Sequence, residues 1–276
     1  MWPMAPLVGL LLTAISVAAS ACWSAEQLPA EPADQPLEVE LFSAIADRQL
    51  DVRVTANNYH SLTVRVRNLT PHLLKVQLPR AVGAMPVDRW QAIQRLEAAG
   101  ANLTDLTDGY GYGQEGSQGL GGYLGGGNSD PRHAAGEPKP KRSESPARVA
   151  TTDGHWTVRP GGRFELRIPA FCLEYGKPDP SKKIPYTICP LRYVNHRPIV
   201  SELIERFGLD DWDQRASQLA LWHVANGLSW EVLSQLRFPP MPGRARNVTS
   251  EEITLAERLA QSLPSYNPTT SLGGGH

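Results

Sequence analysis

The stretch LDVRVTANNYHSLTVRVRNLTPHLLKVQL, residues 50–78, decides the fold class of this chain. Apolar and polar side chains alternate in three short segments within it, at residues 50–54, 62–66 and 74–78. Successive side chains of a strand point to opposite faces, so each segment is predicted to be a strand with one buried face. Turn-forming residues at 68–71 separate two of them. This spacing predicts an antiparallel β-sandwich of the immunoglobulin-like type.

The same alternation returns after a long interruption, at residues 155–159 and 164–168. Two strands alone are marginal in water, so we expect them to pair with the earlier ones. The sandwich is then made of two pieces of chain, residues 37–103 and 151–190. Residues 104–150 between them are rich in Gly, Tyr, Pro and Lys. Glycine loses the most backbone entropy on ordering and this tract buries little apolar area, so it is predicted to be a disordered insertion.

Helical periodicity replaces the alternation in the last third of the chain. One apolar stripe ends in Phe207, and further helices are predicted over residues 211–225, 229–236 and 249–263. We therefore expect a helical unit over residues 191–264 and a disordered tail over 265–276. With shorter helices near residues 41–45 and 90–99, the predicted class is α+β.

The N-terminus is predicted to be an export signal. Residues 7–21 are almost all apolar or small and end in Ala19-Ser20-Ala21, a cleavage-site pattern. A signal peptide over residues 1–21 and a polar spacer over 22–36 follow, with a periplasmic, cell-surface or secreted location. Cys22 stands where bacterial lipoproteins carry their lipidated cysteine; otherwise it is the first residue after an ordinary cleavage or lies inside the discarded peptide. Lipid on Cys22 is the only membrane attachment that we expect.

Composition narrows the class of partner. The formal net charge of the 276 residues is −1, which gives no overall attraction to nucleic acid. We therefore expect a protein or envelope component as partner and no nucleic acid.

Two cysteines in the mature chain are candidates for a disulfide. Cys189 follows Cys172 by 17 positions, and disulfides persist outside the cytoplasm. A bond closing a loop of this size would stabilise the fold by about 3 kcal/mol in the loop-entropy model.

Cys172 also belongs to a second pattern. The segments Phe171-Cys172-Leu173-Glu174-Tyr175-Gly176 and Ser217-Gln218-Leu219-Ala220-Leu221-Trp222-His223 resemble the thioester domains of Gram-positive surface adhesins. The resemblance implies that Cys172 is the thiol and Gln218 the acyl donor, with Ser217, Trp222 and His223 in support. The competing interpretation makes Gln218 a solvated helix residue and Trp222 part of a packing surface. A thioester and a disulfide at Cys172 exclude each other.

A longer resemblance covers most of the mature chain. The Asn68-to-Pro79 stretch, the glycine-rich tract, the Cys172-to-Pro180 stretch and the Ala220-to-Trp230 stretch are similar to a family of exported planctomycete proteins. This resemblance implies no particular activity.

Other chemistry has weak support in the sequence. The seven histidines form no H-E-x-x-H motif, so we expect neither a metal site nor a cofactor. A hydrolase using Cys172 and His223 has no marked oxyanion hole or orienting acid. We expect a non-enzymatic binding or structural protein, with a reactive thioester protein that captures an amine or hydroxyl as the alternative.

Overall fold

The computed structural model describes residues 35–102, 116–124, 154–210, 212–238 and 246–267. It divides the chain into two units, residues 1–34 and 35–276, and all described residues belong to the second. The predicted signal peptide, Cys22, most of the spacer and most of the tail lie outside the described residues. They stay predictions.

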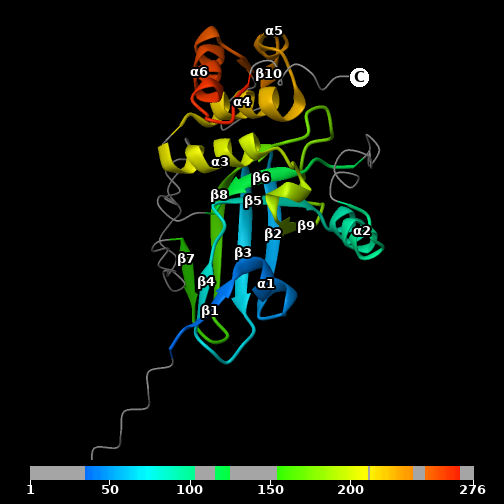
Figure 1. The fold of residues 1–276 in the computed structure, drawn as a ribbon, viewed down its shortest axis with the longest axis vertical. Helices are drawn as coiled ribbons and strands as arrows, with labels where there is room; N and C mark the ends of the chain where they lie inside the picture. Colours follow the sequence, from blue (N-terminus) through cyan, green and yellow to red (C-terminus); the bar gives the residue numbers. More distant parts are fainter. Residues whose placement is uncertain (1–34, 103–115, 125–153, 211, 239–245, 268–276) are drawn as a thin grey trace, which may run out of the picture. The chain divides into compact units, whose positions relative to one another are not determined.

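Six antiparallel strands form a closed barrel in the order β2-β3-β8-β6-β5-β9 (Figure 1). In the longest ladders, β3 pairs with β2 on one side and with β8 on the other, and Val64 lies opposite Leu166. The strands are β2 Leu50–Asn58, β3 Ser61–Asn68, β5 Ala81–Pro86, β6 Leu120–Tyr123, β8 Arg163–Cys172 and β9 Tyr186–Cys189.

A second sheet has three strands, which alternate along the chain with strands of the barrel. It consists of β1 Leu37–Glu40, β4 Leu74–Gln77 and β7 His155–Val158, with β4 in the middle. β1 runs parallel to β4, and β7 runs antiparallel to it. The third alternating segment of the 50–78 stretch therefore leaves the sheet of the first two.

The predicted immunoglobulin-like sandwich is wrong, because the described strands close into a barrel instead of stacking as two sheets. Closure depends on β5 and β9, which join β6 back to β2. Every residue of β5 is buried, so this strand shows no polar alternation. Period-two patterns identify half-exposed strands and carry no information on how a sheet closes.

Part of the tract predicted to be disordered is a barrel strand. β6 lies between β5 and β8, and its two glycines allow other segments of the protein to come close. A Cβ on Gly121 would lie 2.5 Å from Cδ1 of Ile204 in helix α3, Pro198–Asp210. The entropy that glycine loses on ordering favours disorder, but in β6 the absence of a side chain permits the contact between helix and barrel.

The helical part of the chain begins at α3, which contacts β5 and β6 (Figure 1). Helix α4, Gln214–Asn226, contacts α3, α6 and β8. Asp213 caps its start by accepting from the Ala216 amide, and Gly227 ends it in the left-handed region at φ 69°. The other helical elements are α1 Leu41–Ala46, α2 Val87–Ala98, the 3₁₀ turn Leu191–Tyr193, α5 Trp230–Ser234 and α6 Ser250–Gln261; β10 Arg237–Phe238 and β11 Arg246–Asn247 form a small hairpin sheet.

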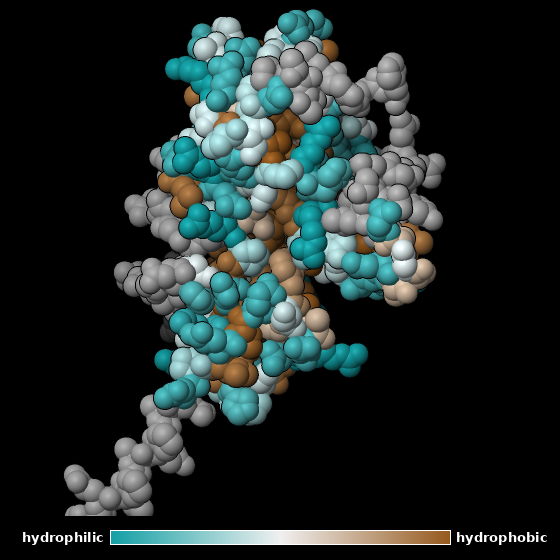
Figure 2. All heavy atoms as spheres, in the orientation of Figure 1, coloured by the Kyte–Doolittle hydropathy of each residue, from teal (hydrophilic) through white to brown (hydrophobic). Residues whose placement is uncertain are grey.

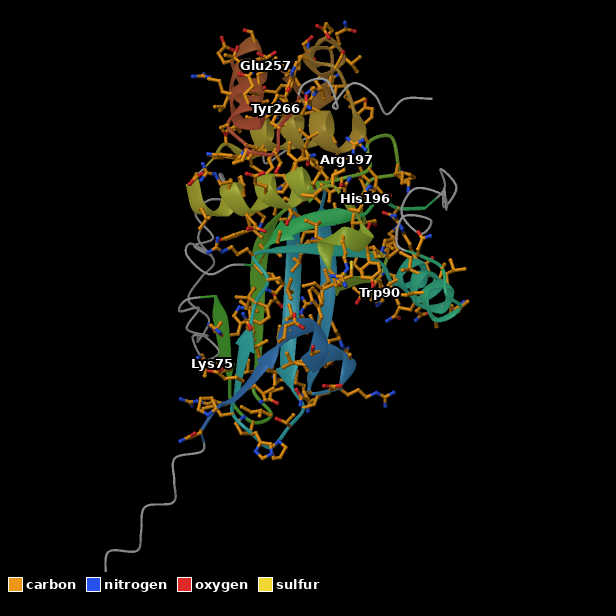
Figure 3. All side chains as sticks on the ribbon, viewed as in Figure 1. Lys75, Trp90, His196, Arg197, Glu257 and Tyr266 are labelled. Atoms are coloured by element: carbon orange, nitrogen blue, oxygen red, sulfur yellow. The ribbon has the colours of Figure 1, made fainter. Side chains whose placement is uncertain are left out.

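Further contacts fasten α4 in place. The Arg197 side chain, labelled in Figure 3, donates to the carbonyl of Val224 at 2.8 Å and so joins the chain before α3 to the end of α4.

Hydrophilic residues cover most of the face in Figure 2, and apolar residues show in a strip between them. Among the described helices, none has the length and apolar character needed to cross a bilayer.

Candidate functional site

The carboxamide of Gln218 is hydrogen-bonded on both sides to the backbone of Cys172. The Cys172 amide donates to Oε1 of Gln218 at 2.9 Å, and Nε2 of Gln218 donates to the Cys172 carbonyl at 2.8 Å. Both residues are buried, with 1% and 2% of their surfaces exposed. The two residues that the sequence resemblance singles out are therefore in direct contact.

The edge of β8 explains why a side chain binds there. The ladder between β3 and β8 ends where Ser61 lies opposite Pro169, three residues before β8 does. On the other edge β6 continues, and the Leu173 amide donates to Gly119. Backbone groups of alternate strand residues point to opposite edges, so those of Cys172 face the position that β3 has left. Gln218 takes the place of a strand residue at this position.

The orientation of the carboxamide is fixed by chemistry. Cys172 offers one donor and one acceptor, and a buried amide must match both to avoid an unsatisfied polar group. Only Oε1 toward the amide and Nε2 toward the carbonyl satisfies the pair. The Cδ carbon of Gln218 is thereby held opposite the Cα of Cys172.

The Cys172 thiol lies on the inner face of the barrel. Cross-strand partners share a face, and Cys172 lies opposite Leu120, which lies opposite Ala84. The Sγ atom is 3.7 Å from the carbonyl oxygen of Tyr59. Burial raises the pKa of this thiol well above its usual value, and the negative charges of Asp179 and Glu174 raise it further.

Cys189 lies on the other face of the barrel wall. It is opposite Gly83, which is opposite Gly121, and Gly121 faces Ile204 of α3. Both cysteines are free and buried. Burial also raises the pKa of the Cys189 thiol. A disulfide between Cys172 and Cys189 would require one strand to turn its side chains over.

The other residues of the second motif point elsewhere. The Ser217 hydroxyl donates to the Asp213 carbonyl at 2.7 Å, within α4. Trp222 stacks on Phe238, with ring centroids 5.4 Å apart. The ring of His223 stacks on Trp230 and its two nitrogens contact the Leu228 carbonyl and the Tyr266 hydroxyl. Burial lowers the pKa of His223. These residues hold the helical part together, and the structure does not bring them to the thiol.

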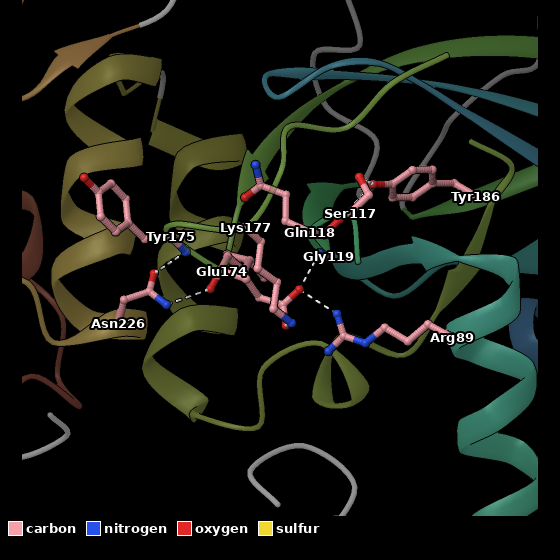
Figure 4. A network of polar contacts seen from close by, with 10 residues as sticks. Arg89, Ser117, Gln118, Gly119, Glu174, Tyr175, Lys177, Tyr186 and Asn226 are labelled. Atoms are coloured by element: carbon pink, nitrogen blue, oxygen red, sulfur yellow. Dashed lines mark hydrogen bonds and ion pairs between the residues drawn. The ribbon is translucent and has the colours of Figure 1, made fainter. Parts of the chain in front are cut away.

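An ion-pair network around the partly buried Glu174 fixes the chain that follows Cys172 (Figure 4). One oxygen of Glu174 accepts from Arg89 of α2 and from the Gly119 amide, both at 2.5 Å. Its other oxygen accepts from Lys177 at 2.8 Å. Burial by itself would raise the pKa of Glu174, but the bonds and charges of Arg89 and Lys177 outweigh it and lower the pKa.

Comparison with protein-family models, curated proteins and solved structures finds no match. The chemistry of the site therefore rests on its own geometry. Across the residues that the structure describes, no group of His, Cys, Asp and Glu is arranged to hold a metal ion.

Two further amides of α4 were missed in the sequence. Nε2 of Gln214 donates to the carbonyls of His60 and Ala170, at 2.8 and 3.2 Å. Asn226 donates to the Leu173 carbonyl at 3.2 Å and accepts from the Tyr175 amide (Figure 4). Their partners are distant backbone groups, which leave no local pattern. The spacing of Gln214 and Gln218 on one helix face was the one available signal.

Proposed function

We propose that Cys172 and Gln218 form an internal thioester and that the chain uses it to join itself covalently to a partner. One observation carries the proposal: the Gln218 carboxamide is held against Cys172 by two hydrogen bonds, across 46 positions of sequence. For the bond to form, the Cys172 sulfur must leave the Tyr59 carbonyl oxygen, 3.7 Å away, and reach the carboxamide carbon of Gln218.

The bond-forming step releases ammonia. The sulfur of Cys172 attacks Cδ of Gln218, the Cδ–Nε2 bond breaks, and Nε2 leaves as ammonia with the thiol proton. In the second step an amine or hydroxyl of the partner attacks Cδ, the C–S bond breaks, and the nucleophile's proton returns to the sulfur. The product is an amide or ester that joins Gln218 to the partner.

Several features of the site support this chemistry. The Cys172 amide donates to Oε1, the atom on which negative charge develops during attack. Burial of both residues keeps out water that would hydrolyse a thioester. The raised pKa of the thiol is the opposing effect, because the thiolate is the attacking form and is scarce at neutral pH. We therefore expect the bond to form slowly and once per chain.

The second candidate function is an exported, non-enzymatic binding or structural protein in which Gln218 only completes the edge of β8. Gln214 and Asn226 favour this candidate, because they make bonds of the same kind to the backbone of residues that are not cysteines. The two candidates differ in whether ammonia is lost.

Intact mass separates them. Thioester formation lowers the mass of the chain by about 17 Da, and methylamine then raises it by about 31 Da. We expect both changes in the unmodified chain and in Cys189→Ser, which keeps the reactive pair. Cys172→Ser is expected to show neither. A native chain with its full mass and no methylamine uptake would leave the structural candidate.

A further inference from the structure

We infer that Gln214 and Asn226 are positioning residues for the reaction between Cys172 and Gln218. Both fix the place of α4 along β8 without touching the reacting atoms. The inference rests on the proposed thioester function and adds the groups that make the attack geometry reproducible.

Gln214 sets the axial position of the helix. It is four residues before Gln218, about 6.0 Å along a helix axis. Its partner Ala170 is two residues before Cys172, about 6.6 Å along a strand. The two spacings nearly match, so a single placement of α4 lets both Gln214 and Gln218 form hydrogen bonds with β8. Because Gln214 also binds the His60 carbonyl in the turn between β2 and β3, it ties α4 to two strands of the barrel.

Asn226 fixes the position of the C-terminal end of α4. It is the last residue of α4 and bonds to Leu173 and Tyr175, just beyond the end of β8. Two helix turns separate it from Gln218, and it projects from a different direction around the helix axis. It therefore resists rotation of α4, as Gln214 resists sliding.

The reaction is sensitive to both movements. A slide of one helix residue moves the carboxamide by about 1.5 Å, and a misplacement of about 1 Å can cost about a hundredfold in rate. Hydrogen bonds tolerate a narrower range than this slide. Loss of either contact should therefore slow the reaction even in a chain that stays folded.

The test compares variants that differ in one property at residue 214. Gln214→Glu keeps the size of the side chain but presents an acceptor to the two carbonyls, whereas Gln214→Lys keeps a donor of similar reach. Asn226→Asp removes the donor at the other end. Val76→Ala, in the sheet of β1, β4 and β7, weakens the core without removing any of the contacts of Gln214, Gln218 or Asn226, and serves as the stability control.

The rate of ammonia loss is followed by intact mass, together with the melting temperature. We expect Gln214→Glu and Asn226→Asp to form the thioester at least about tenfold more slowly. We expect Gln214→Lys to stay within a few-fold of the unmodified chain, and Val76→Ala to keep its rate despite a lower melting temperature. Rates that follow melting temperature across all four variants, or an unchanged rate in Gln214→Glu, would overturn the inference.

A second measurement separates this inference from the proposed function. Hydrogen exchange of the Cys172 amide, taken relative to the Val64 amide in the barrel, reports the contact with Gln218 whether or not ammonia is lost. We expect the ratio to rise about tenfold in Gln214→Glu and to stay constant in Val76→Ala. A full-mass chain with this rise disproves the thioester alone. A constant ratio in Gln214→Glu disproves the positioning role.

Discussion

Cys172 and Cys189 carry their thiols on opposite faces of one barrel wall. Leu120 and Ala84 connect the face of Cys172, and Gly121 and Gly83 connect that of Cys189. The two sulfurs therefore act independently, and Cys172 is left available to a different partner.

Labelling of the unfolded chain distinguishes the three states of Cys172. In denaturant with iodoacetamide and no reductant, a disulfide would leave both Cys172 and Cys189 unlabelled, and two free thiols would both react. Of these two cysteines, a thioester leaves only Cys189 labelled, because the sulfur of Cys172 is acylated. We expect this last pattern, with Cys172 becoming reactive after treatment with methylamine.

Labelling of the native chain should depend strongly on pH. Burial raises the pKa of both thiols, and only the thiolate reacts with iodoacetamide. We expect slow labelling of Cys189 at pH 7 and a rise of about tenfold per pH unit up to pH 9. Labelling that levels off near pH 8 would indicate an ordinary exposed thiol.

Gln218→Glu should lower stability in a way that depends on pH. The carboxylate places a charged acceptor against the Cys172 carbonyl, at a cost of about 2–4 kcal/mol. Burial raises the pKa of the introduced carboxyl above its unfolded value, so the loss is full at high pH and shrinks as pH falls through the raised pKa. Urea unfolding at pH 8 and pH 5 measures this. A deficit equal at both pH values would contradict the hydrogen-bond arrangement.

Glu174→Gln should remove acid-sensitive stability from the barrel. The pKa of Glu174 is lowered in the fold, so its contribution is present above the unfolded value and is lost as pH falls through the folded one. Breaking the pairs with Arg89 and Lys177 should cost about 2–4 kcal/mol at pH 7. Urea unfolding should show the difference from the unmodified chain narrowing at pH 3. A constant difference would place the acid sensitivity elsewhere.

Gly121→Ala should separate α3 from the barrel. The added methyl group meets Cδ1 of Ile204 at 2.5 Å, an overlap that should cost about 1–3 kcal/mol. Ile204→Val removes that atom, so the double variant should recover most of the loss that Gly121→Ala causes. A double-mutant cycle with purely additive effects would contradict the contact.

The alternating strands could be predicted because one of their faces meets solvent. In β3, exposed Arg65 and Arg67 alternate with buried Val64, Val66 and Asn68. β5 and β6 have no exposed face, and the glycines of β6 suggested disorder. Whether strands close into a barrel depends on these two, so the local pattern led to a sandwich.

The contact between Cys172 and Gln218 could be anticipated only through a motif. The resemblance to thioester domains singles out these two residues, and the structure places them in contact. The roles of Gln214, Asn226 and Arg89 could not be predicted from the sequence. Each forms a hydrogen bond with a group more than 25 positions away, and a side chain that binds such a distant group leaves no local sequence pattern.

Peptide mapping of the native chain after methylamine treatment is the most direct test of the thioester between Cys172 and Gln218. We expect N-methylglutamine at residue 218 and a newly free thiol at Cys172, in equal amounts, with neither modification in Cys172→Ser. Unmodified glutamine at residue 218, in a folded chain whose Cys172 thiol is free before treatment, would contradict it.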